Sequence, residues 1–149
     1  MFMRKINFII IHCADTEPDD AIDCSSIDRW HKQRGWKCVG YHFVIPTDGR
    51  LQHGRPVDCV GAHCLYYNKD SIGICYIGGR RQGKFADTRT DAQKLTMEKL
   101  VLNLLKRFPK AKLAGHRDFD PNKMCPCFNV VAWALSIGVA PYRIYRYAQ

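Results

Sequence analysis

The sequence lacks a hydrophobic run long enough to cross a membrane. Its longest candidate, residues 8–11, ends at His12, whereas a spanning helix needs roughly 18 consecutive apolar residues. Internal repeats, low-complexity tracts and Ser/Gly-rich linkers are also missing, so nothing marks a domain boundary. The composition, 46% hydrophobic and 25% charged over 149 residues, excludes a disordered chain, a collagen-like repeat and a coiled coil. We therefore expect one globular domain spanning residues 1–149 and no membrane span.

A secretory leader is not recognisable at the start of the chain either. Arg4 and Lys5 precede an apolar stretch shorter than the roughly 7–15 residues of a signal-peptide core, and no small-residue cleavage site follows. We therefore expect synthesis in a reducing cytoplasm, without a signal peptide. In that compartment the eight cysteines are interpreted as small core residues or metal ligands rather than as disulfide partners.

Acidic residues are few relative to basic ones: 14 Asp and Glu stand against 23 Lys and Arg, a formal net charge of +9. Such a charge favours anionic partners, among them nucleic acid, an anionic membrane surface and the bacterial cell wall. The sequence has no arginine-rich helix, no aromatic–glycine ribonucleoprotein motif and no zinc-finger spacing. We therefore expect no nucleic-acid partner.

Several short apolar segments predict strands. Residues 6–12 are almost continuously apolar and rich in isoleucine, which is typical of a strand buried on both faces in the middle of a sheet. Residues 80–89 are interpreted as a basic, flexible loop. In all, strands are predicted at 6–12, 40–46, 51–54, 71–77 and 112–115.

Helices are predicted between these strands, at 25–34, 90–108 and 130–137. Thr90 and Gln93 form a capping-box pattern ahead of apolar residues at helical spacing. Ser25 and Asp28 form a weaker capping pattern at the first helix. Strands interleaved with helices indicate an α/β fold with a central mixed β-sheet flanked by helices.

Residues of the metal-ligand type concentrate at His12-Cys13, at Tyr41-His42 and in the segment 115–127. His116 ends a predicted strand, and two cysteines follow it across a loop. A site built from His12, His116 and one of these cysteines has three protein ligands and leaves a fourth position for water, which is typical of catalytic zinc.

The residues alone leave the choice of cysteine open. Pro126 favours an extended conformation at Cys125. Side chains two residues apart in an extended chain point the same way, so Cys125 and Cys127 are equal candidates.

Five segments then carry a resemblance to a known family. They occur in order and span most of the chain, from Ile9 to Phe128: IIIHCADT, DRWHKQRGW, GYHFVIPTDG, GAHCLYYNKDSIGICYIGG and GHRDFDPNKMCPCF. The sequence resembles the zinc-dependent N-acetylmuramoyl-L-alanine amidases, which share a fold with peptidoglycan recognition proteins and include phage lysozymes of the amidase type. The resemblance implies a peptidoglycan hydrolase that cleaves the amide between N-acetylmuramic acid and L-alanine and that acts on the cell wall after release or export, with a monomer as the expected state.

The resemblance also implies the roles of six residues. Carried over by motif, they are the zinc ligands His12, His116 and Cys125, the catalytic residues Tyr41 and Lys123, and His63 near the cleft as a substrate-binding residue. Zinc lowers the pKa of bound water to about 7 and polarises a carbonyl, which a poorly electrophilic amide requires.

The two catalytic residues have distinct expected tasks. Lys123, a cation close to Cys125, is expected to face the negative charge that develops on the amide oxygen. Tyr41 is expected to share a strand face with Phe43 and to orient or deprotonate the attacking water. Nearby zinc is expected to lower the pKa of both groups.

Two alternatives stay open on the sequence. The first is a non-catalytic peptidoglycan-binding module of the same fold, which would lack a zinc ligand. The second is a metal-free hydrolase with Cys125 as nucleophile and a histidine as base. The remaining ligand-type residues are expected to be structural: His31 and His53 at the surface or in a structural role, His42 in the core, Cys13 facing away from His12, and Cys24, Cys38, Cys59, Cys64 and Cys75 in packing.

Overall fold

The computed structural model describes residues 4–146, and its centre is a five-stranded sheet. Four strands are parallel and only the edge strand β3 runs antiparallel, to its neighbour β2. This mixed α/β arrangement confirms the predicted fold class. In spatial order the strands are β3 (Gln52–His53), β2 (Phe43–Ile45), β4 (Ser71–Tyr76), β1 (Phe8–Cys13) and β7 (Lys112–Gly115).

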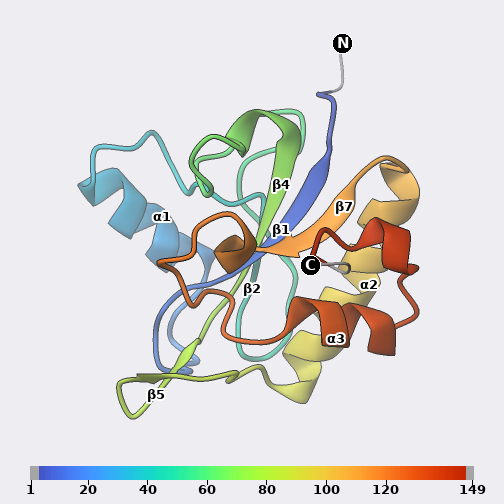
Figure 1. Cartoon of the computed structure of the whole chain (residues 1–149). Coiled ribbons are helices and arrows are strands. Elements are labelled where there is room, and N and C mark those ends of the chain that lie inside the picture. Colours follow the sequence, from blue (N-terminus) through green and yellow to red (C-terminus); the bar gives the residue numbers. More distant parts are fainter. Residues whose placement is uncertain (1–3, 147–149) are drawn as a thin grey trace.

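Helices cover the sheet on both faces (Figure 1). The helix α1 (Cys24–Gln33) lies on one side, and α2 (Asp91–Arg107) with α3 (Val130–Ser136) lies on the other. Within residues 4–146, the remaining elements are three single-turn 3-10 helices and a two-stranded hairpin: η1 (Asn68–Asp70), η2 (His116–Asp118), η3 (Pro141–Arg143), β5 (Arg80–Arg81) and β6 (Lys84–Phe85).

Alternate residues of the strands form two separate apolar clusters. Ile9 and Ile11 of β1 belong to the larger cluster, together with Leu104 of α2 and Ala134 of α3. The smaller cluster lies on the opposite face and is formed by Ile27, Val39, Val44, Cys75 and Ile77. Because side chains alternate along a strand, one strand serves both layers.

The helix starts are only partly as predicted. Thr90 accepts from the backbone N–H of Gln93 and the Gln93 side chain accepts in return, so the predicted capping box of α2 is confirmed. In α1 the capping residue is Asp23, whose carboxylate accepts from the backbone of Ser26. The predicted pairing of Ser25 with Asp28 is therefore wrong. A carboxylate at the N-cap accepts from the backbone and also interacts favourably with the positive end of the helix dipole.

Two other local predictions are wrong. The strand predicted at 40–46 begins only at Phe43, because Arg55 and Gly54 donate to the carbonyls of Tyr41 and His42 and draw this stretch into a loop. The segment 80–89 holds the β5–β6 hairpin instead of a flexible loop. Its residue Arg80 pairs with the carboxylate of Asp15 and lies over the ring of Phe85 at 3.9 Å, which fixes the hairpin.

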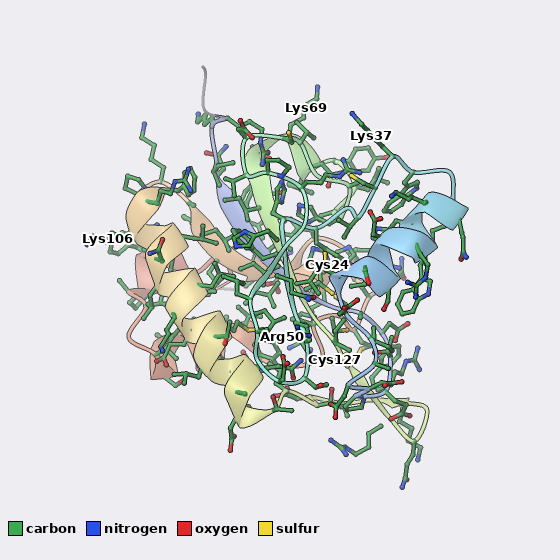
Figure 2. The ribbon with its side chains drawn as sticks, turned by 180° about the vertical axis from the view of Figure 1, so that it is seen from behind. Cys24, Lys37, Arg50, Lys69, Lys106 and Cys127 are labelled. Atoms are coloured by element: carbon green, nitrogen blue, oxygen red, sulfur yellow. The ribbon has the colours of Figure 1, made fainter. Side chains whose placement is uncertain are left out.

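The cysteines are all free thiols. Cys13, Cys64 and Cys75 are buried, as expected of packing residues, but Cys59 is exposed and its predicted packing role is wrong. Basic side chains such as Lys37, Lys69 and Lys106 project from different edges of the molecule (Figure 2). Among residues 4–146, no helix combines the length and the apolar character that a membrane crossing requires.

Candidate metal centre

The sheet register brings His12 and His116 together. Strands β1 and β7 are parallel neighbours, with Ile11 paired to Gly115. The residue after each of these therefore lies at the same carboxyl edge of the sheet, where α/β folds commonly place their ligand sites. The imidazole rings of His12 and His116 lie 4.6 Å apart between centroids.

Cys125 reaches the same edge from the loop between η2 and α3. Its carbonyl accepts from the backbone N–H of Arg117 at 2.8 Å, and its sulfur accepts from the backbone N–H of Cys13 at 3.1 Å. The next residue, Pro126, packs so closely on Gly115 that a Cβ there would lie 2.7 Å from the proline ring. These contacts hold the loop against β1, which carries His12, and against the end of β7, which His116 follows.

The structure separates the two cysteines that the sequence left open. Cys127 has a left-handed backbone with φ of +67°, so the chain is not extended at this point. Its sulfur lies 3.8 Å from the sulfur of Cys13, on the other side of β1 from His12. The expectation that Cys13 faces away from His12 is therefore confirmed, and Cys127 faces away with it.

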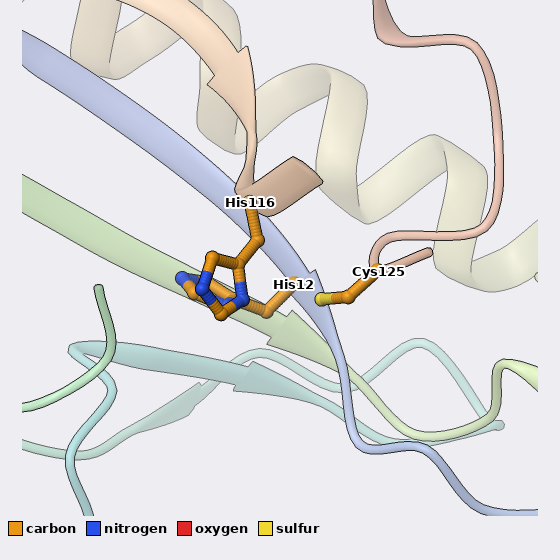
Figure 3. A group of neighbouring side chains, drawn as sticks. All are labelled: His12, His116 and Cys125. Carbon is orange, nitrogen blue, oxygen red and sulfur yellow. The ribbon is translucent and has the colours of Figure 1, made fainter. Parts of the chain in front are cut away.

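The three candidate ligands form a compact group. One ligand atom from each of His12, His116 and Cys125 lies within 4.8 Å of the others, and the thiol of Cys125 points toward the two rings (Figure 3). Among the described residues, this is the one group of three or more His, Cys, Asp or Glu side chains with such spacing.

The electrostatic surroundings keep both imidazoles neutral. Burial, followed by the neighbouring His63 and His116, holds the pKa of His12 well below its usual range. Burial and then the nearby Lys123 lower the pKa of His116. Neutral imidazole is the form that binds a metal, so these ligands do not have to lose a proton first.

A family model described as N-acetylmuramoyl-L-alanine amidase matches residues 2–128. The chain belongs to this amidase family. The family resemblance and the enzyme class predicted from the sequence are thereby confirmed.

Individual relatives agree with this assignment. The endolysin of Enterobacteria phage T3 is 40% identical over 140 residues, which cover 88% of this chain and 92% of the relative. The endolysin of Escherichia phage T7 is 40% identical over 126 residues, covering 84% and 83%. The solved structure of the amidase LysC from Clostridium intestinale superposes with a TM-score of 0.79 at 29% identity, covering 92% of this chain and 88% of that one.

The candidate metal centre of this amidase lies in a cleft of about 680 Å³. Its walls come from α1, from the loop before η1 and from the loop that carries Cys125. Trp30 and Trp36 both line it. Several further lining residues were not predicted, because their positions depend on how distant segments of the chain fold together: Asp15, Leu65, Asn68, Phe85, Asp120 and Asn122.

Tyr41 lies beside the candidate ligand His12, with the two rings 5.1 Å apart between centroids. It packs against the smaller cluster with Val44, whereas Phe43 belongs to the larger cluster. The predicted shared face with Phe43 is therefore wrong, because the chain before β2 is not a strand. Burial raises the pKa of the Tyr41 phenol well above its usual range, and nearby thiols, chiefly Cys75, act in the same direction.

Lys123 also lines the cleft, on the loop between Asp120 and Cys125. The side chain is exposed. Burial lowers the pKa of the candidate ligand His116, and the charge of Lys123 acts in the same direction.

His63 contacts the candidate ligand His12 through a ring nitrogen. Its Nδ1 lies 2.9 Å from Nε2 of His12, and its Nε2 lies 3.1 Å from Oγ of Ser71. Burial holds the pKa of His63 well below its usual range.

The other histidines match their structural expectation. His42 is buried and its Nδ1 accepts from the backbone N–H of Gly73, whereas His31 is buried and accepts from that of Gly40. His53 is exposed on β3.

Proposed function

We propose that this chain is a zinc-dependent peptidoglycan amidase with His12, His116 and Cys125 as the metal ligands. The observation that carries the proposal is the convergence of these three side chains at the floor of an open cleft. The proposed reaction is hydrolysis of the amide between N-acetylmuramic acid and L-alanine, the bond after which the family is named.

The donor set fits zinc. Two imidazole nitrogens and one thiolate are ligands that Zn²⁺ prefers, and three protein ligands leave one position open, as in catalytic zinc sites. When bound in such a site, zinc activates water and polarises the carbonyl that is attacked. Within residues 4–146 the group holds three such side chains, the number typical of catalytic rather than structural zinc.

Tyr41 is the proposed group that orients the reacting water and the amide. Its raised pKa means that the phenol keeps its proton at neutral pH. A protonated phenol donates a hydrogen bond rather than accepting a proton, so orientation is favoured over the role of general base.

Lys123 is the proposed partner of the negative charge that develops on the amide oxygen. It is exposed at the mouth of the cleft and still close enough to influence His116. A fixed cation at this point stabilises the transition state more than the neutral ground state, which is the condition for a gain in rate.

The cleft suits a large, extended substrate. It is open, and two tryptophans of its wall, Trp30 and Trp36, offer flat apolar surfaces. We further propose that the chain acts as a monomer on the cell wall after release from the cytoplasm, by analogy with the phage endolysins that it resembles.

Peptidoglycan digestion with a parallel zinc measurement tests the proposal. An amidase releases new L-alanine amino termini without new reducing sugars, and the activity should follow the zinc content during chelation and reconstitution. New reducing ends would identify a glycosidase instead. Full activity in metal-free protein would overturn zinc dependence and favour a cysteine nucleophile.

A further inference from the structure

The second ring nitrogen of the candidate ligand His12 is held by another histidine. Nε2 of His12 and Nδ1 of His63 are 2.9 Å apart, and both side chains are buried. We infer that His63 is a positioning residue that fixes the orientation and the tautomer of His12 for zinc. This inference rests on the proposed function and replaces the substrate-binding role that the family motif suggested for His63.

The hydrogen bonds are consistent with one placement of the protons on the ring nitrogens of His12 and His63. Because Nε2 of His12 is engaged by His63, Nδ1 is the nitrogen left for a metal. A neutral, metal-binding imidazole then carries its proton on Nε2 and donates it to Nδ1 of His63. The proton of His63 therefore resides on its Nε2 and is donated to Oγ of Ser71, at 3.1 Å.

The surroundings of His63 hold the ring in this orientation. The backbone N–H groups of His63 and Cys64 both donate to Oδ1 of Asn68, at 2.8 and 2.9 Å. Glycines flank the ring: a Cβ on Gly73 would lie 2.7 Å from its Cγ, and one on Gly61 would lie 2.8 Å from its Cδ2. Such distances are shorter than real Cβ contacts, so the ring occupies space that only glycine leaves free.

The same contacts argue against a direct role in substrate binding. The side chain is only 9% exposed, and both ring nitrogens face protein partners. A substrate would have to displace His12 or Ser71 to reach a polar atom of His63. Metal-bound histidines usually donate their second N–H to a carboxylate, a carbonyl or water, and here a second histidine serves as the acceptor.

The test is the zinc affinity of the full chain, measured by competition with a chromophoric chelator. We expect His63→Ala to weaken zinc binding by about 10–100-fold, the usual effect of losing an outer hydrogen bond to a ligand. His63→Asn should restore most of the affinity, because its Oδ1 lies where Nδ1 lay and accepts from His12. Ser71→Ala should cause a smaller loss. His42→Asn is the matched control, a buried histidine that does not bond a ligand, and should leave zinc affinity unchanged.

If His63→Ala does not fold, a second measurement on the milder variants tests the inference. Absorption bands of the Co²⁺-loaded protein report the ligand geometry, and they should shift in Ser71→Ala and return to the wild-type pattern in His63→Asn. Equal zinc affinity of wild type and His63→Ala, with a raised KM, would overturn the inference and support substrate binding. Equal losses in His63→Ala and His63→Asn would also overturn it, because packing alone would then explain them. A wild-type chain without zinc affinity would overturn the proposed function and this inference together.

Discussion

The two faces of the central sheet are built from alternate residues of the same strands, but they differ in composition. On β4, Ile72, Ile74 and Tyr76 belong to the large apolar cluster beneath α2 and α3. Cys75 points the other way and is paired in register with His12. That face also carries Tyr41, His63 and the cleft.

The two faces therefore have different roles: one contributes most of the stability, and the other holds the candidate site. The α2–α3 face buries a large set of apolar side chains, whose removal from water is the main source of folding free energy. The α1 face uses less apolar area and holds a hydrogen-bonded set of histidines around an open site. Substitutions on one face should therefore change stability, and those on the other should change metal binding and rate.

The largest expected effect comes from the two neighbouring cysteines. Cys125→Ser should abolish zinc binding and reduce amidase activity to the assay background, because one of three ligands is lost. Cys127→Ser, two residues away, should keep both, because its sulfur faces Cys13 on the apolar side. Metal content and release of L-alanine amino termini check this pair, and the opposite pattern would assign the ligand to Cys127.

A second test removes a charge without removing a ligand. Lys123→Ala should lower kcat by about 10²–10³-fold, the typical effect of losing one group that stabilises a developing oxyanion. Its zinc content should stay at the wild-type level. Lys106→Ala, an exposed lysine on α2, is the control and should have wild-type kcat. A change in KM alone would show that Lys123 only binds substrate.

A third test addresses the apolar face. Leu104 is 2% exposed in the large cluster, and Leu104→Ala should lower the free energy of unfolding by about 2–5 kcal/mol. Zinc stoichiometry and kcat of the folded fraction should not change. Urea unfolding of the metal-free protein measures the first quantity. A parallel loss of zinc affinity would show that the two faces are coupled.

The smallest expected effect is a pH dependence of the free energy of unfolding, caused by buried histidines on the α1 side of the sheet. Burial lowers the pKa of His31 and of His42 to about 4 in the folded state, against about 6.5 in the unfolded chain. Between these values only the unfolded chain takes up the proton, so stability falls as the pH is lowered from 6.5 to 4. Both histidines act on the slope of stability against pH in this same direction.

Urea unfolding at several pH values with a chelator present measures this slope. His31→Asn keeps an acceptor for the Gly40 N–H and removes the titrating ring, so its slope should be smaller than that of the wild type. An unchanged slope would show that His31 does not titrate in this range.

The fold class follows from the sequence alone, and the candidate site residues follow from the resemblance of its motifs to a family. The isoleucine-rich β1, the capping box at Thr90 and the order of strands and helices follow from local patterns, because burial and capping depend on nearby residues. His12, His116 and Cys125 could be named because each lies in a motif of the amidase family. What no motif supplied is how close their side chains lie to one another.

The tertiary structure alone shows that the thiol of Cys125, and not that of Cys127, lies beside the two histidines, and it alone shows the face of Tyr41 and the partner of His63. These depend on long-range contacts: the left-handed turn at Cys127, the bonds from Gly54 and Arg55 that interrupt the strand before Phe43, and the 2.9 Å contact between residues 51 positions apart. Periodicity describes how a side chain points relative to its own element. It carries no information on which residue of a distant loop the side chain meets.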